Sequence, residues 1–388
     1  MKRIVYGLLL LAALGLAGFL SLGPGIVERA QNRKIEHAPW PVSAAARALH
    51  ESLRIADWHA DSLLWNRDLL ERGSYGHADI PRLAEGNVAV QVFTTVTKVP
   101  AGLNYQENAA DARDNITLLS MAQLWPPRSW RSLTERALYQ SQKLHELQAR
   151  APNRVRVIRS RGDLAAVLAA REAGRPLLGA IMGAEGAHAL EGDINNLGRL
   201  YDAGFRVIGL QHFFDNALGG SLHGQSGAGL TDFGREVVRE MAARRIIIDL
   251  AHSSPRVVRD VLAMVDVPVI VSHTGIDGNC PSKRNFDDAL MQEIAAAGGL
   301  VGIGFWEEVT CDPSPDGVAK TIKAAIDLLG VGAVSLGSDY DGAIEAAFDA
   351  SELAALTDAL LRAGLTEEEI RAVMGENLLG FLAANLPR

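Results

Sequence analysis

The sequence predicts an α/β fold of the closed (β/α)8 barrel class, and two observations lead to this prediction. Eight apolar runs alternate along the chain with amphipathic helical stretches, as in the repeated strand–helix units of a parallel sheet. Most of these runs are apolar almost throughout, which is typical of strands buried on both faces. Eight such units favour a closed barrel. An open doubly wound sheet is the alternative, but no Gly-rich dinucleotide loop follows the first run.

The predicted elements follow one another in a regular order. The predicted strands are residues 53–58, 87–96, 176–183, 206–212, 245–252, 267–273, 299–306 and 333–339. The main helices expected between them are residues 163–174, 196–204, 233–245, 254–265, 286–298 and 318–330. Several of these end in glycine, which commonly stops a helix. Two connections are longer than simple loops: a mostly helical insertion, 102–150, and a Gly-rich loop, 213–234. The second follows the carboxyl end of the fourth predicted strand, where a long loop often forms a lid or a wall of a site.

The N-terminus differs from the body of the chain. Lys2 and Arg3 precede an apolar run, residues 5–22, which is longer than the ~7–15 residues of a secretory signal and close to the ~20 of a spanning helix. We predict that residues 1–24 are a signal peptide or a membrane anchor. The anchor is slightly favoured because no clear A-x-A cleavage site is present. A buried core helix is a third interpretation, disfavoured because the run has no polar face.

The rest of the chain divides into a short connection and one domain. Residues 25–48 are predicted to be a linker and the start of the first helix, with Ser43 as the N-cap of that helix. Residues 49–388 are predicted to be a single (β/α)8 domain. The positive N-terminal residues would stay in the cytoplasm, so the domain would be exported to the periplasmic or extracellular face.

Composition excludes some functions. The net charge is −8 and the body has no Lys/Arg cluster, so we expect no nucleic acid partner. Hydrophobic residues make up 48% of the chain, which is ample for a large core. The only two cysteines, Cys280 and Cys311, form no CxxC motif, and a thiolate zinc site is therefore excluded.

Side chains that bind metals gather at the ends of the predicted strands. His59 and Asp61 are two residues apart where the first strand ends, so both can point into a barrel mouth. Five more such residues end later strands: Glu185, His212, His252, His273 and Asp339. Active sites of this fold lie at that end of the barrel. Alone, each is more often a structural residue, but so many buried polar groups are costly unless a metal compensates them. The remaining candidates lie off this pattern and are interpreted as structural: His77, His188 and His223.

The set of donor groups predicts the metal. Imidazole and carboxylate without thiolate suit Zn²⁺ with open positions for water. Three or four histidines with at least two carboxylates exceed the needs of one ion. Two ions ~3.5–4 Å apart need a bridging carboxylate, and Glu185, alone at its strand end, is the natural bridge. Two cations would lower the pKa of a shared water enough for hydroxide to exist near neutral pH.

A family resemblance adds to this interpretation. The motifs DWHADSLLW, GHADIPRLAEGNVAVQVF, GAEGAH, GLQHFFDN, IDLAHSS, VIVSHTG, SKRNFDD and LGSDYDG occur in the order found in the membrane dipeptidase (renal dipeptidase) family of zinc metallopeptidases. The resemblance spans about residue 51 to the C-terminus, and the combination is specific although each motif alone is not. It implies a dinuclear zinc barrel enzyme that hydrolyses the peptide bond of dipeptides by attack of a metal-bridging hydroxide. Family members tolerate a D-residue at the second position, and some open β-lactam rings.

The resemblance also implies the ligands of the two ions. Carried over by position, His59 and Asp61 bind the first zinc, and His252 and His273 bind the second. Glu185 bridges both.

Three further residues receive catalytic or substrate-binding roles from the resemblance. His212 contacts the substrate carbonyl oxygen and stabilises the oxyanion, while Asp339 holds the bridging water and passes its proton to the leaving amine. Arg284 holds the free carboxylate of the dipeptide, which suits the fork of a guanidinium. Trp58 and Ala60 depart from the family pattern around the first histidine, which puts substrate preference in doubt more than metal binding.

Cys280 and Cys311 are predicted to form a disulfide. An exported chain meets an oxidising compartment, and the pair resembles a cysteine pair near the substrate arginine in vertebrate relatives.

The expected partners are small dipeptides and, if the N-terminal segment is retained, the membrane; a homodimer is left open. Two other functions stay as alternatives: another barrel metal hydrolase, such as an N-acyl-amino-acid deacylase, and a membrane-tethered non-catalytic binding protein. Arg284 argues against the first, and the complete ligand set against the second.

Overall fold

The structure of the chain, a computed structural model, describes residues 2–388, except for the side chains of residues 2, 8–14, 16, 17 and 19. Parallel strands form a closed barrel in the order β2-β3-β5-β6-β7-β8-β9-β10, and pairing of Leu336 with Asp57 joins the last strand to the first. The eight barrel strands are β2 (Ile55–Ala60), β3 (Val88–Phe93), β5 (Leu178–Ala184), β6 (Phe205–Gly209), β7 (Ile247–Asp249), β8 (Ile270–Thr274), β9 (Leu300–Ile303) and β10 (Val334–Leu336). The predicted barrel and each of its eight strands are confirmed.

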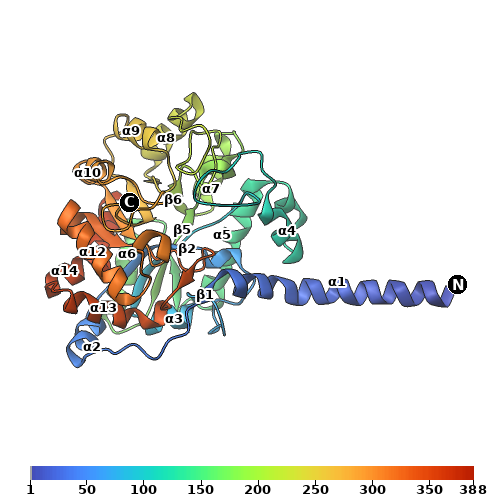
Figure 1. Cartoon of the computed structure of the whole chain (residues 1–388), viewed down its shortest axis with the longest axis horizontal. Coiled ribbons are helices and arrows are strands. Elements are labelled where there is room, and N and C mark those ends of the chain that lie inside the picture. The colour runs from blue at the N-terminus through green and yellow to red at the C-terminus, as the bar shows by residue number, and fades with distance from the viewer. Residues whose placement is uncertain (1) are drawn as a thin grey trace.

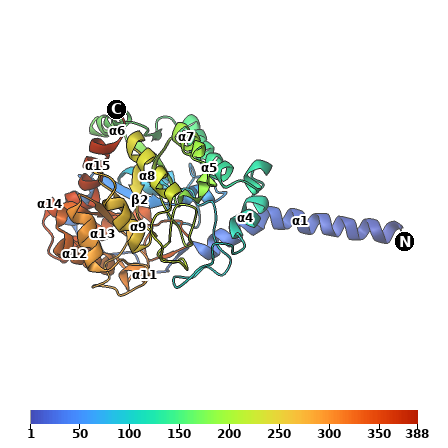
Figure 2. The ribbon, with the colours of Figure 1, turned by 90° about the horizontal axis from the view of Figure 1, so that it is seen from above.

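Helices surround the barrel (Figures 1 and 2). In chain order they are α2 (Ala44–Glu51), α3 (Ile80–Glu85), α4 (Asn115–Ala122), α5 (Leu133–Arg150), α6 (Arg161–Glu172), α7 (Asn195–Asp202), α8 (Asp232–Arg244), α9 (Pro255–Leu262), α10 (Asp288–Ala296), α11 (Glu307–Thr310), α12 (Pro315–Leu329), α13 (Leu353–Arg362), α14 (Glu367–Arg371) and α15 (Asn377–Asn385). Short polar side chains cap many of their N-termini; Ser43, for example, accepts a hydrogen bond from the Ala46 amide as predicted.

The strands are fully buried because helices cover the outside of the barrel while side chains fill its inside. Trp58 shows the outward side of β2: it is fully buried and its ring meets Phe381 of α15 edge-on at 5.7 Å. Its neighbour His59 faces the opposite side because side chains alternate along a strand. The departure from the family pattern at Trp58 therefore lies in the packing of α15 against the barrel.

Three short strands lie outside the predictions. β4 (Val155–Val157) pairs with the first half of β5 and extends the barrel sheet. β1 (Arg33–Lys34) pairs with β11 (Glu345–Ala346), more than 300 residues later in the chain. None of these three strands lies in a long apolar run like those that mark the barrel strands, so the sequence gives no signal for them.

The first helix, α1 (Lys2–Gln31), projects from one side of the barrel with the N-terminus at its far end (Figure 1). Residues 25–31 were expected to belong to a linker, but they are helical, and Pro24 lies inside the helix. Buried contacts that Glu28 and Asn32 make with the barrel domain outweigh the local preference of a Gly-Pro-Gly sequence to break a helix.

The predicted signal peptide or anchor, residues 1–24, includes side chains outside the described residues and stays a prediction. Within the part of the chain that the structure describes, no helix meets the length and apolarity needed to cross a membrane.

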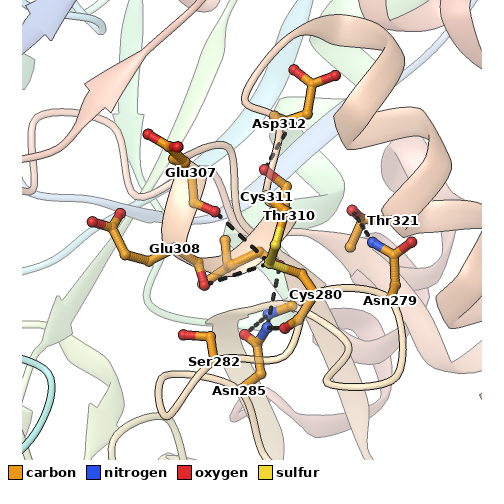
Figure 3. Close-up of a disulfide and its surroundings, with 12 residues drawn as sticks. Asn279, Cys280, Ser282, Asn285, Glu307, Glu308, Thr310, Cys311, Asp312 and Thr321 are labelled. Carbon is orange, nitrogen blue, oxygen red and sulfur yellow. Dashed lines mark hydrogen bonds between the residues drawn. A yellow bond between two sulfur atoms is a disulfide. The ribbon is translucent and has the colours of Figure 1, made fainter.

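The predicted disulfide is confirmed. Cys280 and Cys311 are joined, with their Cα atoms 5.5 Å apart. The bond ties the loop before α10 to the turn that follows α11 (Figure 3). Asn285 in the same loop donates its side-chain amide to the carbonyl of Cys280 at 2.9 Å. The loop that carries Arg284 is therefore fixed covalently and by hydrogen bonds.

Candidate metal centre

All seven predicted strand-end residues meet at the carboxyl end of the barrel. His59 and His273 lie within β2 and β8, and the other five follow their strands by one to three residues: Asp61, Glu185, His212, His252 and Asp339. All seven are buried. Their ligand atoms form three overlapping groups that could each hold a metal ion: His59–His273–Asp339, Glu185–His212–His252 and His59–Asp61–Glu185.

Glu185 stands at the centre of this cluster. One of its oxygens, Oε1, lies 3.1 Å from Nε2 of His252, 3.3 Å from Nε2 of His273 and 3.6 Å from Nε2 of His59. The other oxygen, Oε2, lies 3.2 Å from Nε2 of His212. Imidazoles from four different strands thus converge on a single carboxylate.

Neighbouring side chains orient the metal-binding groups. The hydroxyl of Ser272 donates to Asp249 at 2.6 Å and can accept a hydrogen bond from Nδ1 of His273 at 2.8 Å. Such a bond places the proton of His273 on Nδ1 and leaves the Nε2 lone pair free for a metal. Thr94 donates to Oδ1 of Asp61 at 2.6 Å. The supporting contacts are those expected around metal ligands.

The buried ring nitrogens fit a bound cation. Nε2 of His59 has no hydrogen-bond partner although the side chain is fully buried. Nε2 of His252 and Nε2 of His273 face each other at 3.1 Å. Unprotonated nitrogens placed in this way are costly without a donor, and a cation satisfies all of them.

The acidic groups also favour a positive ion. Burial, with the carboxylate of Asp61 nearby, raises the pKa of Glu185 well above its usual value. Burial raises the pKa of Asp339 to about 8. Burial lowers the pKa of His59, but the carboxylates of Asp61, Glu185 and Asp339 outweigh it and raise that pKa to about 10. The cluster alone favours protons at these positions, and metal binding displaces such protons.

The other imidazoles behave in the opposite way. Burial lowers the pKa of His212 to about 4. Burial, with the nearby guanidinium of Arg284, also holds the pKa of His252 and of His273 well below the usual value. These three side chains are therefore neutral at physiological pH, which is the form that binds metals or donates one N–H.

Two residues of the cluster, Asp339 and His252, have a left-handed backbone. Asp339 has a left-handed φ of 61°, which is unusual for a residue other than glycine. A Cβ at Gly342 would lie 2.1 Å from the Asp339 carboxylate, so only glycine leaves room for this side chain. His252 is also left-handed, with a φ of 62°. Such strained residues often occur at functional sites.

Arg284 is buried beside the cluster. Its Nη2 donates to the carbonyl of His273 at 2.7 Å and lies 3.3 Å from Nε2 of His252. Among the described residues it makes no ion pair within 4.0 Å: Asp287 caps α10, and Asp288 accepts from the Gly278 amide. Neither aspartate therefore forms a surface ion pair with Arg284. A buried guanidinium without a carboxylate is costly, so an anionic group of a ligand fits here.

A cavity of about 470 Å³ opens over the cluster. Six of the polar groups described above line it: Asp61, Glu185, His212, His252, Arg284 and Asp339. Much of the remaining lining is apolar and aromatic, including Trp65, Phe213 and Trp306. The volume suits a small ligand.

Sequence reasoning missed part of the supporting structure. Asp57 accepts hydrogen bonds from the Ser338 amide, at 2.8 Å, and from the Ser338 hydroxyl, and so holds the loop that carries Asp339. Asp57 precedes His59 by two residues on the same strand, so the sequence could have placed both side chains on the inner face of the barrel. Asp249 was read only as part of an apolar strand.

The three histidines interpreted as structural lie in different places. The hydrogen bonds of His77 are made with Asp341 and with the Arg33 carbonyl, and none is made with the metal-binding cluster. His188 contacts the Thr97 hydroxyl at 2.9 Å. His223 packs beside the site, with its ring centre 5.6 Å from that of His252.

A match to a known protein family covers most of the chain. Residues 43–384 match the family model described as Membrane dipeptidase (Peptidase family M19). The chain belongs to this family. It is therefore a metallopeptidase of the dipeptidase class, as the motifs predict.

Solved structures agree with this membership of the membrane dipeptidase family. A metallo peptidase from Rhodobacter sphaeroides, liganded with a phosphinate mimic of the dipeptide L-Ala-D-Ala, is 26% identical; the match covers 86% of this chain and 99% of that one, with a TM-score of 0.69. The dipeptidase AC, a metallo peptidase of family M19, is 25% identical, with 87% and 99% covered and a TM-score of 0.69. The probable dipeptidase PvdM from Pseudomonas aeruginosa, 17% identical, shares the fold, with a TM-score of 0.71 over 87% and 97% of the two chains.

Proposed function

We propose that this membrane dipeptidase family member is a dinuclear zinc enzyme that hydrolyses the peptide bond of dipeptides. One observation carries the proposal: Nε2 atoms of three histidines lie within 3.1–3.6 Å of a single oxygen of Glu185. A carboxylate surrounded in this way can bridge two ions, and imidazole with carboxylate is a donor set that zinc accepts.

Side-chain positions support the division of ligands between the two ions that the resemblance implies. His59 and Asp61 would hold one ion, since Nε2 of His59 lies 3.6 Å from Oδ1 of Asp61. His252 and His273 would hold the other, and their Nε2 atoms lie 3.1 Å apart. Oε1 of Glu185 lies 3.6 Å from Nε2 of His59 and 3.1 Å from Nε2 of His252, so Glu185 would bridge the two ions.

When bound, two zinc ions would polarise the scissile carbonyl and lower the pKa of an attacking water. His212, whose Nε2 faces the cluster 3.2 Å from Oε2 of Glu185, would donate a hydrogen bond from that nitrogen to the oxygen that gains negative charge. Asp339, once bound metal has displaced its own proton, would accept the proton of the attacking water and pass it to the leaving amine. Its carboxylate lies 3.8 Å from Nε2 of His59, at the edge of the cluster.

Arg284 would bind the free carboxylate of the dipeptide. It is 2% exposed and reaches the same cavity as His212 and Asp339. A site that holds the carboxylate and the amide, rather than both side chains, would accept a D-residue at the second position. The phosphinate mimic of L-Ala-D-Ala in the Rhodobacter sphaeroides relative supports this extension. We further propose that the N-terminal segment exports the enzyme and holds it at the membrane.

Metal content and substrate range of the purified full chain test the proposal. We expect about two zinc ions per chain and release of free alanine from L-Ala-L-Ala and L-Ala-D-Ala, with a far slower reaction on N-acetyl-L-alanine. Preference for N-acetyl-L-alanine would favour the deacylase alternative. Zinc binding without any hydrolysis would favour the non-catalytic binding protein.

A further inference from the structure

The end of α1 forms one side of the cavity over the metal centre. Val27 and Gln31, one helical turn apart, both line that cavity. The loop after β10 contributes the adjoining residues, Gly342, Ala343 and Ile344. A helix that precedes the barrel in the chain therefore reaches the mouth of the active site.

A buried charged contact fixes this helix end. Glu28, 2% exposed, accepts a hydrogen bond from Nε of Arg67 at 2.7 Å. The same guanidinium binds Asp341, two residues beyond Asp339. Pro24, Glu28 and Asn32 recur every four residues and are all buried, so they form one helix face against the barrel domain. Val27 and Gln31 lie on the adjacent face, toward the cavity.

Backbone contacts continue the attachment beyond the helix. The Asn32 side chain accepts a hydrogen bond from the Ala343 amide at 2.8 Å. β1 then pairs with β11, so that Arg33 and Lys34 run beside Glu345 and Ala346. The N-terminal segment is thus joined to the same loop that carries Asp339.

Apart from Asn115 of α4, the rest of this part of the cavity is apolar. Leu64 and Val96 follow β2 and β3, and Ile116 and Leu119 lie on α4. α4 lies beside the base of α1 in both views (Figures 1 and 2), and the two helices are in contact. None of these four side chains has a group that could bind an ion or a terminus of a dipeptide. They offer a surface for an apolar substrate side chain.

The family match begins at residue 43, so Val27 and Gln31 lie outside the matched region. We propose that the end of α1 is part of the substrate site, and that Val27 limits the size of the apolar side chain that the enzyme accepts. This inference rests on the proposed dipeptidase function. It assigns substrate selection to a segment that precedes the catalytic domain.

Substitutions at Val27 in the full chain test this, with Ile26 as the matched control. Ile26 is the neighbouring apolar residue on the same helix, is 65% exposed, and does not line the cavity. Val27→Trp should lower kcat/KM for Leu-Leu about tenfold or more relative to Ala-Ala, chiefly through KM, because the indole fills space that the larger substrate needs. Ile26→Trp should leave the ratio of the two kcat/KM values unchanged. Zinc content should be the same in both variants.

The reverse substitution keeps the test decisive if Val27→Trp folds poorly. Val27→Ala removes two methyl groups at a partly exposed helical position and should shift the ratio toward Leu-Leu, while Ile26→Ala should not. If the wild type hydrolyses both dipeptides, but the ratio of the two kcat/KM values is the same in the Val27 and Ile26 variants, this inference alone is overturned. A wild type that hydrolyses neither dipeptide would overturn the proposed function and this inference with it.

Discussion

Two aspartates, only two residues apart, behave in opposite ways. Asp339 and Asp341 are both buried and both have left-handed backbones. Asp341 pairs with Arg67 and accepts hydrogen bonds from Ser62, at 2.5 Å, and from the His77 amide, at 2.6 Å. Burial works against ionisation at both sites, but these partners hold the pKa of Asp341 below its usual value. Burial raises the pKa of Asp339 to about 8.

The two buried charged clusters of the molecule also differ in how their acids are paired. The Arg67 network comprises Glu28, Arg67, Asp79, Arg82, Asp341 and Asp349, and each of its acids lies against an arginine of the network. In the metal centre, the carboxylates lie against imidazoles, and the buried Arg284 has no acidic partner within 4.0 Å in the described part of the chain. A cluster in which every charged group has a partner of opposite charge supports the fold, whereas one that leaves a buried cation unpaired is suited to bind a ligand.

The largest expected effect is at the bridging carboxylate. Glu185→Gln removes the charge that two ions would share, so we expect loss of most bound zinc and a fall in kcat/KM of about a thousandfold or more. The metal-free protein should remain about as stable as the metal-free wild type, since burial favours the neutral form of Glu185 there and His59 keeps the carboxylate of Asp61 at 3.6 Å. Metal analysis, kinetics and thermal unfolding measure the three quantities.

Asp79→Asn is the matched acid-to-amide change in the Arg67 network. Asp79 is fully buried, caps α3 and pairs with Arg82, and it lies outside the metal centre. This variant should bind zinc normally and unfold more easily. Zinc loss in Asp79→Asn, or retained zinc in Glu185→Gln, would contradict the distinction between the clusters.

The second effect concerns stability. Arg82 is 6% exposed and holds Asp79, Asp349 and the Gly73 carbonyl. Arg82→Met leaves buried carboxylates without this cation, and we expect a loss of about 3–5 kcal/mol in the free energy of unfolding. The kcat/KM of the folded fraction should change little. Denaturant unfolding with parallel kinetics below the transition is the measurement.

Arg284→Met replaces the buried arginine of the metal centre in the same way. It should lower kcat/KM strongly and stability less, the reverse of the result expected for Arg82→Met. Removing a guanidinium that binds the substrate carboxylate costs ~2–5 kcal/mol, or roughly thirty- to several-thousandfold in kcat/KM for dipeptides. The loss should be much smaller for dipeptide amides, which lack the carboxylate. Stability should fall less than in Arg82→Met. Equal losses for dipeptides and amides would mean that Arg284 supports the site without binding the carboxylate.

Much of the metal centre could be predicted because its residues are tied to local patterns. His252 and His273 stand at or just beyond buried apolar strands, and a parallel barrel brings all such positions to one end. The resemblance then supplied Arg284, which lies in a loop without periodicity. Glu185 was recognisable for a similar reason, as a lone acid at the end of an apolar run.

The Arg67 network and the end of α1 could not be predicted in this way. Glu28 meets Arg67 across 39 residues and Arg67 meets Asp341 across 274, so no local pattern connects them. The Gly-Pro-Gly sequence before Glu28 favours a break in the helix. Only the tertiary contacts of Glu28 and Asn32 reverse that preference and bring Val27 to the cavity.

His50 allows the smallest test, because this buried group belongs to neither cluster. Its Nδ1 lies 2.9 Å from the Thr357 hydroxyl, and burial lowers its pKa to about 4, below the ~6.5 of an unfolded chain. Between pH 6.5 and 4 the unfolded chain binds more protons at this residue, so stability falls as the pH falls through that range. His50→Gln keeps a hydrogen-bonding side chain that does not titrate. Between pH 7 and 4.5 the wild type should lose on the order of 2 kcal/mol more unfolding free energy than this variant. Urea unfolding at the two pH values measures these losses. If the wild type and His50→Gln lose the same unfolding free energy, the folded state does not lower the pKa of His50.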